Sequence, residues 1–548
     1  MQNLRLQKFY RPSSWTILAI ATALLIATPI LAVLSGLFTD TRAIWQHLAK
    51  TVLSTYITNS LWLMLGVGIG VTTIGTGLAW LVTLCRFPGS RAFTWLLLLP
   101  LAAPAYILAY AYTEFLDFYG PVQSALRSTF GWKGTQEYWF PNVRSLWGAI
   151  VMLTLVLYPY VYLLARSAFL SQSVCMLETS RSLGCNPWQS FVRVALPLAR
   201  PAIVTGLSLA LMEALNDYAT VQFFGIDTFT TGIYRTWFGM GDRPAATQLS
   251  VFLLLFVFAL ILSEKMSRGR TQYYQIANSN QAVQPFQLRG LRAIVSAILC
   301  LIPLTLGFLI PGGFLLQMTL ENLEQAFDQR FWVFATNSLT VAGVTAIISV
   351  VVAVVLAYAL RLQPTLSTRL ATQTAVMGYA IPGSVIAVGI LMPLGSFDNM
   401  IDAWMRSTFN YSTGLLLSGT IFALIFAYLV RFLALSFGSV ESSLTSIKPS
   451  LDDASRSLGY GATATLLKVH IPLLWKGILA AGILVFVDVM KELSATLIIR
   501  PFNFNTLAIH VYNLAADERL AEASGSALAI VLVGLIPVII LSWQMDHK

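Results

Sequence analysis

Acidic side chains occur inside two stretches of the chain that are otherwise apolar. Glu213 and Asp217 lie four residues apart, so that a helix would carry both on one face. The pair recurs 275 residues later as Asp488 and Glu492. Because hard cations favour carboxylate oxygens, one interpretation is that the four acids attract a cation into a path. The alternative is that they pair locally, for instance with Lys491, or reach external water.

The elements that must hold these acids are membrane-spanning helices. The chain of 548 residues is 57% hydrophobic and 11% charged, and its mean hydropathy is +0.72. This composition excludes an ordinary soluble protein. The net charge of +10 therefore has to be interpreted through the distribution of Lys and Arg between the two sides of the membrane. Apolar runs of about 20 residues, enough to cross a bilayer, lie near 15–37, 59–83, 92–115, 146–165, 198–221, 246–263, 293–316, 335–360, 370–394, 413–436, 473–498 and 525–544. The predicted fold class is an all-α integral membrane protein with about twelve transmembrane helices.

The chain contains one short motif twice. Leu177 to Gly184 reads LETSRSLG, and Asp452 to Gly459 reads DDASRSLG. Thirteen residues after each glycine comes a proline, Pro197 in the first copy and Pro472 in the second. An identity of five letters with a proline at a fixed distance indicates an internal duplication.

The duplication predicts the organisation of the whole chain. The letters Asn-Ser-Leu, for example, occur at 59–61 and again at 337–339. We predict a first repeat of six helices over 1–263, a polar cytoplasmic linker over 264–292 and a second repeat of six helices over 293–548. Because six spans are an even number, the chain returns to the side from which it started, and both repeats enter the membrane from the same side. The repeats are therefore parallel, and a pseudo-twofold axis along the membrane normal should relate them.

Lys and Arg residues predict the orientation. They concentrate in segments that an inside N-terminus would place in the cytoplasm, including the linker, whose basic residues would contact anionic lipid. Both SRSLG motifs and both termini are then cytoplasmic. The four Cys and four His show no metal-ligand spacing, so we expect no metal site and no cofactor. The chain has no Walker-type phosphate loop, so ATP chemistry would need a partner.

Each motif carries the signals of a helix, a turn and a second helix. Gly184 can take the left-handed conformation that ends a helix. Asn186 and Pro187 suit the N-cap and the first residue of the next helix. Such an amphipathic piece could simply lie on the membrane surface. Its repetition at matched places favours a function that the two loops share.

The two loops resemble the EAA signature of permease subunits of binding-protein-dependent ABC importers. In that signature a Glu-Ala-Ala triplet precedes a glycine and a later proline, and the second copy here has Asp for Glu. The resemblance implies that each loop is a coupling helix that docks into a groove of a cytoplasmic ATPase. The residues assigned to coupling are Glu178, Arg181, Gly184, Pro197, Asp453, Arg456, Gly459 and Pro472.

Within this class the chain is similar to the fused, two-repeat ferric-iron permeases, on stretches such as 158–169, 215–239 and 488–512. The resemblance implies a permease of the bacterial inner membrane without enzymatic activity of its own. It would work by alternating access with a periplasmic iron-binding protein and two ATPase subunits. Related permeases carry thiamine, polyamines or phosphonates, and these substrates stay open beside iron(III). An ion-coupled secondary transporter is the alternative from another class.

Overall fold

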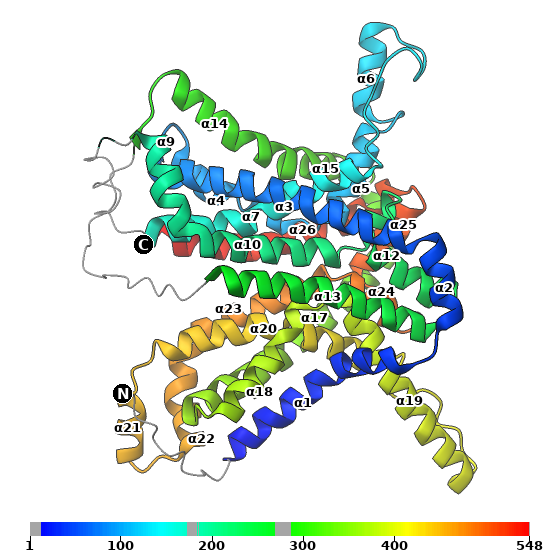
Figure 1. Ribbon diagram of the computed structural model, residues 1–548, viewed down its shortest axis with the longest axis vertical. Coiled ribbons are helices and arrows are strands. Elements are labelled where there is room, and N and C mark those ends of the chain that lie inside the picture. The colour runs from blue at the N-terminus through cyan, green and yellow to red at the C-terminus, as the bar shows by residue number, and fades with distance from the viewer. Residues whose placement is uncertain (1–12, 172–183, 185, 269–285, 547–548) are drawn as a thin grey trace. The chain divides into compact units, whose positions relative to one another are not determined.

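The computed structural model describes residues 13–171, 184, 186–268 and 286–546, and these are almost entirely helical (Figure 1). Eleven helical segments among them are long and apolar enough to cross a membrane. A twelfth is obtained when the pair Ser90–Ala102 and Ala105–Phe130, bent by 89° at its break, is taken as one span. The expected all-α membrane fold with about twelve helices is confirmed.

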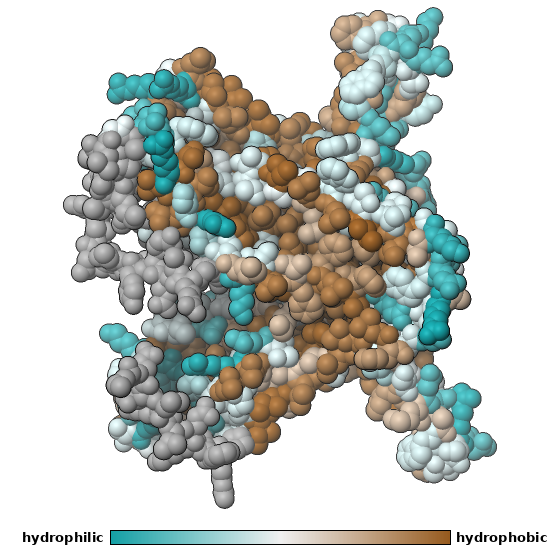
Figure 2. Space-filling view, in the orientation of Figure 1, coloured by the Kyte–Doolittle hydropathy of each residue, from teal (hydrophilic) through white to brown (hydrophobic). Residues whose placement is uncertain are grey.

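The outer faces of the helices are apolar. Figure 2 shows hydrophobic residues along the sides of the helices and hydrophilic residues toward their ends. On α14 (Leu291–Leu304) the side chains of Leu291, Ile294, Ile298 and Leu301 are 46–76% exposed. Their spacing places them on one face of the helix. A continuous apolar face of this kind is unfavourable in water and suits contact with lipid.

The chain divides into two compact units, and each is described by itself. Unit 1 comprises 1–35, 338–489 and 499–504, and unit 2 comprises 36–337, 490–498 and 505–548. Unit 1 contains α1 (Ser14–Ser35), most of α17 (Gln329–Leu362), α18 (Leu366–Val376), α19 (Gly383–Phe409), α20 (Ile421–Thr445), α21 (Ser450–Ser457), α22 (Ala462–Thr465) and nearly all of α23 (Ile471–Met490).

Unit 2 contains the remaining helices and two short parallel strands, which pair Cys85 with Phe286 and Arg86 with Gln287. Its elements are α2 (Arg42–Thr51), α3 (Leu53–Leu84), β1 (Cys85–Arg86), α4 (Ser90–Leu96), α5 (Ala105–Leu116), α6 (Pro121–Phe130), α7 (Leu146–Ser171), α9 (Pro187–Ser190), α10 (Leu196–Asn216), α11 (Ala219–Phe223), α12 (Phe229–Tyr234), α13 (Arg243–Arg268), β2 (Phe286–Gln287), α14, α15 (Ile310–Glu321), α16 (Leu323–Ala326), most of α24 (Ser494–Ile499), α25 (Leu507–Ala516) and α26 (Leu520–Asp546).

The first helix of each predicted repeat packs in the unit that consists mainly of the other repeat. In unit 1, α1 packs against α18 and α19, and a Cβ added at Gly389 would lie 2.3 Å from the carbonyl oxygen of Pro29. In unit 2, α15 packs against α5 and α26. The hydroxyl of Tyr112, on α5, donates to the carbonyl of Leu306, which lies in the helical turn that directly precedes α15. The two compact units are defined by contacts within the fold, whereas the two repeats are defined by similarity in sequence. The units therefore do not test the boundaries of the repeats, which stay a prediction.

Candidate coupling site

The second SRSLG motif forms a helix, a sharp turn and a second helix at one end of unit 1 (Figure 1). α21 ends at Ser457, and α22 begins at Ala462. Between them Gly459 has a φ of +82°, in the left-handed region that side chains disfavour. A Cβ at this position would meet nothing within 4 Å. The backbone conformation, and not lack of space, therefore requires glycine here.

The glycine of the first motif has the same backbone conformation. Gly184 also has a φ of +82°. The Asn186 side chain accepts from the Gln189 N–H at 2.8 Å, and the Gln189 side chain accepts from the Asn186 N–H at 3.1 Å, which caps α9 reciprocally. The glycine turn and the Asn186 cap expected from the sequence are both present. Glu178 and Arg181 lie outside the described residues.

A π-helical turn follows each motif at the same place. Phe191–Ala195 leads into α10, and Leu466–His470 leads into α23. Pro197 and Pro472 are exposed and closely follow these π-helical turns inside a continuous helix, and a π-helical turn is a place where the regular hydrogen bonding of a helix is already altered. Each motif is thereby continuous with a long helix of the membrane region.

The outward face of the second motif consists of the predicted coupling residues and an apolar side chain. Asp453 and Arg456 are exposed, and their charged groups lie 3.8 Å apart on α21. Leu458, next to the glycine turn, is 76% exposed. An exposed leucine between charged side chains is suited to the groove of another protein.

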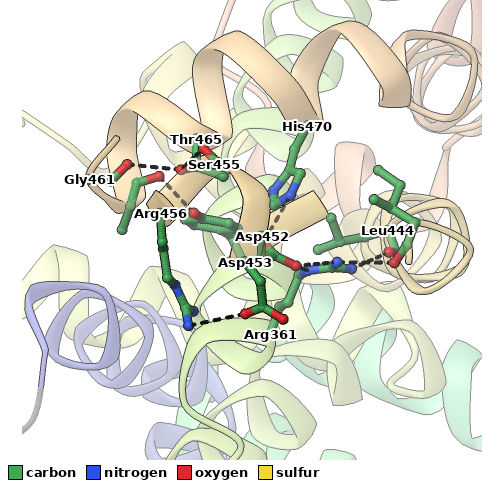
Figure 3. Close-up of polar contacts among 12 residues, drawn as sticks. Arg361, Leu444, Asp452, Asp453, Ser455, Arg456, Gly461, Thr465 and His470 are labelled. Atoms are coloured by element: carbon green, nitrogen blue, oxygen red, sulfur yellow. Dashed lines mark hydrogen bonds and ion pairs between the residues drawn. The ribbon is translucent and has the colours of Figure 1, made fainter. Parts of the chain in front are cut away.

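The inward face is held by an ion network around Asp452 (Figure 3). Arg361, near the end of α17, donates to one oxygen of Asp452 from Nη2 at 2.6 Å and from Nε at 3.1 Å. The same guanidinium donates to the carbonyls of Leu444 at 2.6 Å and Ile447 at 3.0 Å, at the end of α20. The Nε2 of His470 lies 3.0 Å from the other Asp452 oxygen. One arginine thus joins three helices at the base of the loop.

Two further hydrogen bonds link α22 to its surroundings. The hydroxyls of Ser455 and Thr465 lie 2.7 Å apart and join the two helices of the motif. The Tyr358 hydroxyl donates to the carbonyl of Ala462 at 2.6 Å. Because these contacts act on the inward side, they fix the loop and leave its outward face available.

Aromatic rings pack behind the described part of the first loop. Trp80 of α3 contacts Phe191, which follows α9, at 4.8 Å between ring centroids, and it contacts Phe169 of α7 at 5.7 Å. Such ring pairs stabilise by apolar burial and favourable edge contacts. At the place that corresponds to His470, the first repeat has the buried Ala195. The two glycines share one backbone conformation, and the described residues behind the two loops make different kinds of contact.

Sequence reasoning missed Arg361, Asp452 and His470. Two signals were present: Arg361 is a charge at the end of a long apolar helix, and Asp452 adds a second acid beside Asp453 where the first copy has Leu177. Neither signal identifies the partner, because Arg361 and Asp452 are 91 residues apart.

The intramembrane acids lie where two long helices end. α10 stops at Asn216, and Asp217 then accepts from the N–H of Thr220 at 2.7 Å and from its hydroxyl at 2.8 Å. α23 stops at Met490, and Glu492 accepts from the N–H of Ala495 at 2.8 Å. Each carboxylate satisfies a free N–H at the start of a short helix, α11 in one repeat and α24 in the other.

These two breaks are corrections to the sequence expectation, which extended the spans to 221 and 498. Within unit 2 the breaks are linked, because the Ser494 hydroxyl donates to the Asn216 carbonyl at 3.1 Å. Irregular backbone is tolerated at membrane depth only where protein or a water-filled cavity satisfies it. A broken helix is also the usual place for a substrate site in transporters.

The four predicted acids are not equally placed. Glu492 is buried, while Glu213, Asp217 and Asp488 are partly exposed. Asp488 falls in unit 1 and the other three fall in unit 2. In the part of the chain that the structure describes, no three His, Cys, Asp or Glu side chains gather as metal ligands.

The repeated Asn-Ser-Leu letters have matching contacts. The Asn59 side chain donates to the carbonyl of Asp227 at 2.9 Å, and the Asn337 side chain donates to the carbonyl of Asn505 at 3.0 Å. Both bonds join residues that are 168 apart in sequence. The duplication is therefore present in tertiary contacts and not only in letters.

Comparison with known proteins agrees with this geometry. Residues 72–272, which include the first motif, match the family described as "Binding-protein-dependent transport system inner membrane component". The Fe(3+)-transport system permease protein FbpB 2 of Haemophilus influenzae is 26% identical over 97% of this chain and 98% of its own length. The chain is a binding-protein-dependent permease.

Other relatives define the type of permease more closely. The ferric transport system permease protein FbpB of Actinobacillus pleuropneumoniae is 24% identical over 88% of the permease and 70% of its own length. The molybdenum transport system permease protein ModB of Escherichia coli is 26% identical but matches only 35% of the permease. The permease is thus of the fused two-repeat kind, a multi-pass inner membrane protein of a class that works with a binding protein and an ATPase.

Proposed function

We propose that this permease imports iron(III) in a complex with a periplasmic binding protein and two cytoplasmic ATPase subunits. The observation that carries the proposal is the match along 97% of the chain to a relative named for Fe(3+) transport. Relatives named for molybdenum and for 2-aminoethylphosphonate match 35% and 44% of the chain. Only the ferric relatives among these span both repeats, so iron(III) is the substrate best supported.

Each coupling loop would bind one ATPase. In the second loop Asp453, Arg456 and the exposed Leu458 form the contact, and Asp452 with Arg361 holds them in place. In the first loop Glu178 and Arg181 take the corresponding places in the sequence. Two loops on one polypeptide require one permease chain for two ATPases. Both loops, and with them both termini, would then be cytoplasmic.

The route from ATPase to substrate follows single helices. α23 begins directly after the π-helical turn of the second loop and ends at Met490, two residues before Glu492. Its 20 residues extend about 30 Å at 1.5 Å per residue. α10 connects the first loop to Asp217 in the same manner. Movement of a loop on ATP binding would therefore displace a helix break, which is what alternating access requires.

Reconstitution tests the proposal. The permease would be placed in liposomes with ATPase inside and iron-loaded binding protein outside, and uptake of iron(III) would be measured beside molybdate, thiamine, a polyamine and a phosphonate. ATP-dependent accumulation of iron alone is the expected result. Accumulation of one of the other compounds instead would mean that this compound, and not iron(III), is the substrate of the permease. Uptake that follows an ion gradient and needs no ATPase would instead indicate a secondary transporter.

A further inference from the structure

The distal half of α19 turns its apolar side outward. Phe397, Met400 and Trp404 are spaced by three and four residues, which places them on one face of the helix. These residues are 43–61% exposed. Phe409 at the end of the helix is also exposed, and its ring packs edge-on against Trp404 at 5.8 Å between centroids. Large apolar side chains gathered on an outer face are unfavourable in water and indicate an apolar neighbour.

The polar side of the same helix segment is turned inward. Asp398 is buried, and its carboxylate accepts from the N–H of Ser418 at 2.7 Å and from the Ser418 hydroxyl at 2.5 Å. Asp402 accepts from the N–H of Thr413 at 2.8 Å. The two acids thus hold the returning chain, residues 410–420, against the helix. A helix that borders only on water has the reverse arrangement, with its acids outside and its aromatic rings inside.

The first predicted repeat has a hairpin of the same kind. Its α5, like α19, begins directly after a proline, and it leads into α6. In α6, Gln123 is buried and accepts from the Tyr138 hydroxyl at 2.6 Å, while Arg127 donates to that hydroxyl at 3.1 Å. Polar side chains of the helix again hold the returning chain, and the rings of Phe130 and Trp139 are exposed. The inverted arrangement therefore occurs in both hairpins.

The α19 hairpin lies across the membrane from the coupling loop of its own unit. The returning chain leads directly into α20, a candidate span whose 25 residues extend about 37 Å. α21 of the coupling loop follows the far end of α20. Figure 1 shows the distal half of α19 projecting sideways beyond the end of α1. In Figure 2 the hydrophilic residues of this hairpin gather on its far side, away from α1.

We propose that the outward face of α19, formed by Phe397, Met400 and Trp404, lies on the lipid of the membrane surface opposite to the coupling loops. Trp and other aromatic side chains are concentrated where a bilayer meets water. An amphipathic helix lies in that plane with its apolar face on the acyl chains. The apolar surface also continues along the chain, because Leu416 of the returning chain and Phe422 at the start of α20 are exposed.

A bilayer suits this face better than the binding protein does. A protein that delivers substrate leaves after each delivery, and the face would then stay in water, whereas lipid is always present. The charged residues of 391–420 are Asp398, Asp402 and Arg406, which contact each other or the returning chain. The outward face therefore offers a partner protein no charge to recognise. The proposal holds for whichever substrate the permease imports.

Lipid contact at this place would have a mechanical consequence. The first part of α19 is buried and packs against α1, where a Cβ at Gly389 would meet the Pro29 carbonyl. Because aromatic side chains at the membrane surface set the depth and tilt of the helices that carry them, the hairpin would hold one end of unit 1 at the membrane surface. The coupling loop at the other end is the end that an ATPase would move.

Nitroxide labels on single cysteines measure the contact in lipid nanodiscs without binding protein. The four native cysteines would first be replaced by alanine. Met400→Cys then places a label on the outward face. Asn399→Cys is the matched control, because Asn399 is exposed on the same helix but points about 100° away from Met400. Both labelled chains must retain ATPase binding and stimulated ATP hydrolysis.

The readout is how often each label collides with oxygen, which concentrates in lipid, and with a water-soluble nickel chelate. We expect the ratio of oxygen to nickel collisions to be several-fold higher at Met400→Cys than at Asn399→Cys. Equal, water-like ratios would overturn the proposal. If added binding protein then shielded the label at Met400→Cys, the face would belong to that protein. Lipid-like ratios at both positions would also overturn it, because the whole segment would then lie inside the bilayer.

Tryptophan fluorescence gives a second measurement in a chain that keeps its cysteines. The difference in emission between the unmodified permease and Trp404→Phe isolates the signal of Trp404. Brominated lipid should quench this difference, and iodide in the water should leave it nearly unchanged. The opposite pattern, with quenching by iodide and none by brominated lipid, would refute the lipid contact even if the labelled variants failed to assemble.

Discussion

Removal of the Arg361 guanidinium should loosen the second coupling loop and leave the first unchanged. The side chains of Arg361 and Asp452 are only 16% and 14% exposed. In Arg361→Leu the carboxylate loses two donors, and the carbonyls of Leu444 and Ile447 lose one each. Breaking a fully buried ion pair costs about 3–5 kcal/mol. Since some water reaches this pair, we expect a loss of about 2–3 kcal/mol in the stability of the loop.

Hydrogen exchange of the permease in lipid nanodiscs measures this change. A loss of about 2–3 kcal/mol corresponds to roughly 30- to 150-fold faster exchange of the α21 amides. The first loop is the internal control, because Trp80 and the phenylalanines beside it provide its support. Arg456→Leu is the matched variant, since its pair with Asp453 is exposed and should contribute about 0–1 kcal/mol.

A double variant separates the ion pair from general damage. In Arg361→Leu with Asp452→Leu both charges are absent, and apolar replacement of a buried pair is often close to neutral. The double variant should therefore exchange more slowly at α21 than Arg361→Leu alone. Unchanged exchange in Arg361→Leu, or equal acceleration in both loops, would refute the assignment of this network to the second loop.

Three further predictions follow from the same contacts. Gly459→Arg should abolish ATPase binding. The variant should still reach normal membrane levels, because the site is open and only the positive φ opposes a side chain, at about 1–2 kcal/mol. Gly414→Arg is the control: Gly414 has a φ of +62° and equal space, so this variant should bind the ATPase normally, and an equal loss of ATPase binding in both variants would contradict the coupling role. Asn337→Ala should lower stability by about 1 kcal/mol in thermal unfolding, through its lost bond to the Asn505 carbonyl, and an unchanged midpoint would count against that bond. Asp217→Asn keeps an acceptor for the α11 cap but removes the charge, so iron uptake should fall while stability stays unchanged. Asp217→Ala should lower iron uptake and also lower stability by about 1 kcal/mol, because the cap is lost. Iron uptake at the unmodified rate in Asp217→Asn would mean that the acid has a structural role only.

Several features were predictable from the sequence because they depend on neighbouring residues alone. A run of about 20 apolar residues crosses a bilayer wherever it lies in the fold, and the helical spans follow from that. Gly184 and Gly459 have the left-handed turn that their place after a helical stretch predicts. Asn186 caps α9 as its type and position before Pro187 predict.

The helix breaks were harder to predict. Hydropathy continues through Asp217 and Glu492, so the apolar pattern alone extends both spans past their true ends. The local signal was an acid three residues before the N–H that it caps, which is too common to decide a break. The break is stable because Ser494 satisfies the Asn216 carbonyl from 278 residues away.

The supports of the two loops were decided by tertiary structure alone. The motifs share the letters SRSLG, yet Arg361 and His470 contact Asp452 in the second loop, while Trp80, Phe169 and Phe191 pack behind the described part of the first. The packing of α1 against α18 and α19 is equally invisible in the sequence pattern. Hydrophobic periodicity specifies which face of a helix is covered, but it does not specify which distant helix covers it. That choice depends on the fit of side chains that only the folded chain brings together.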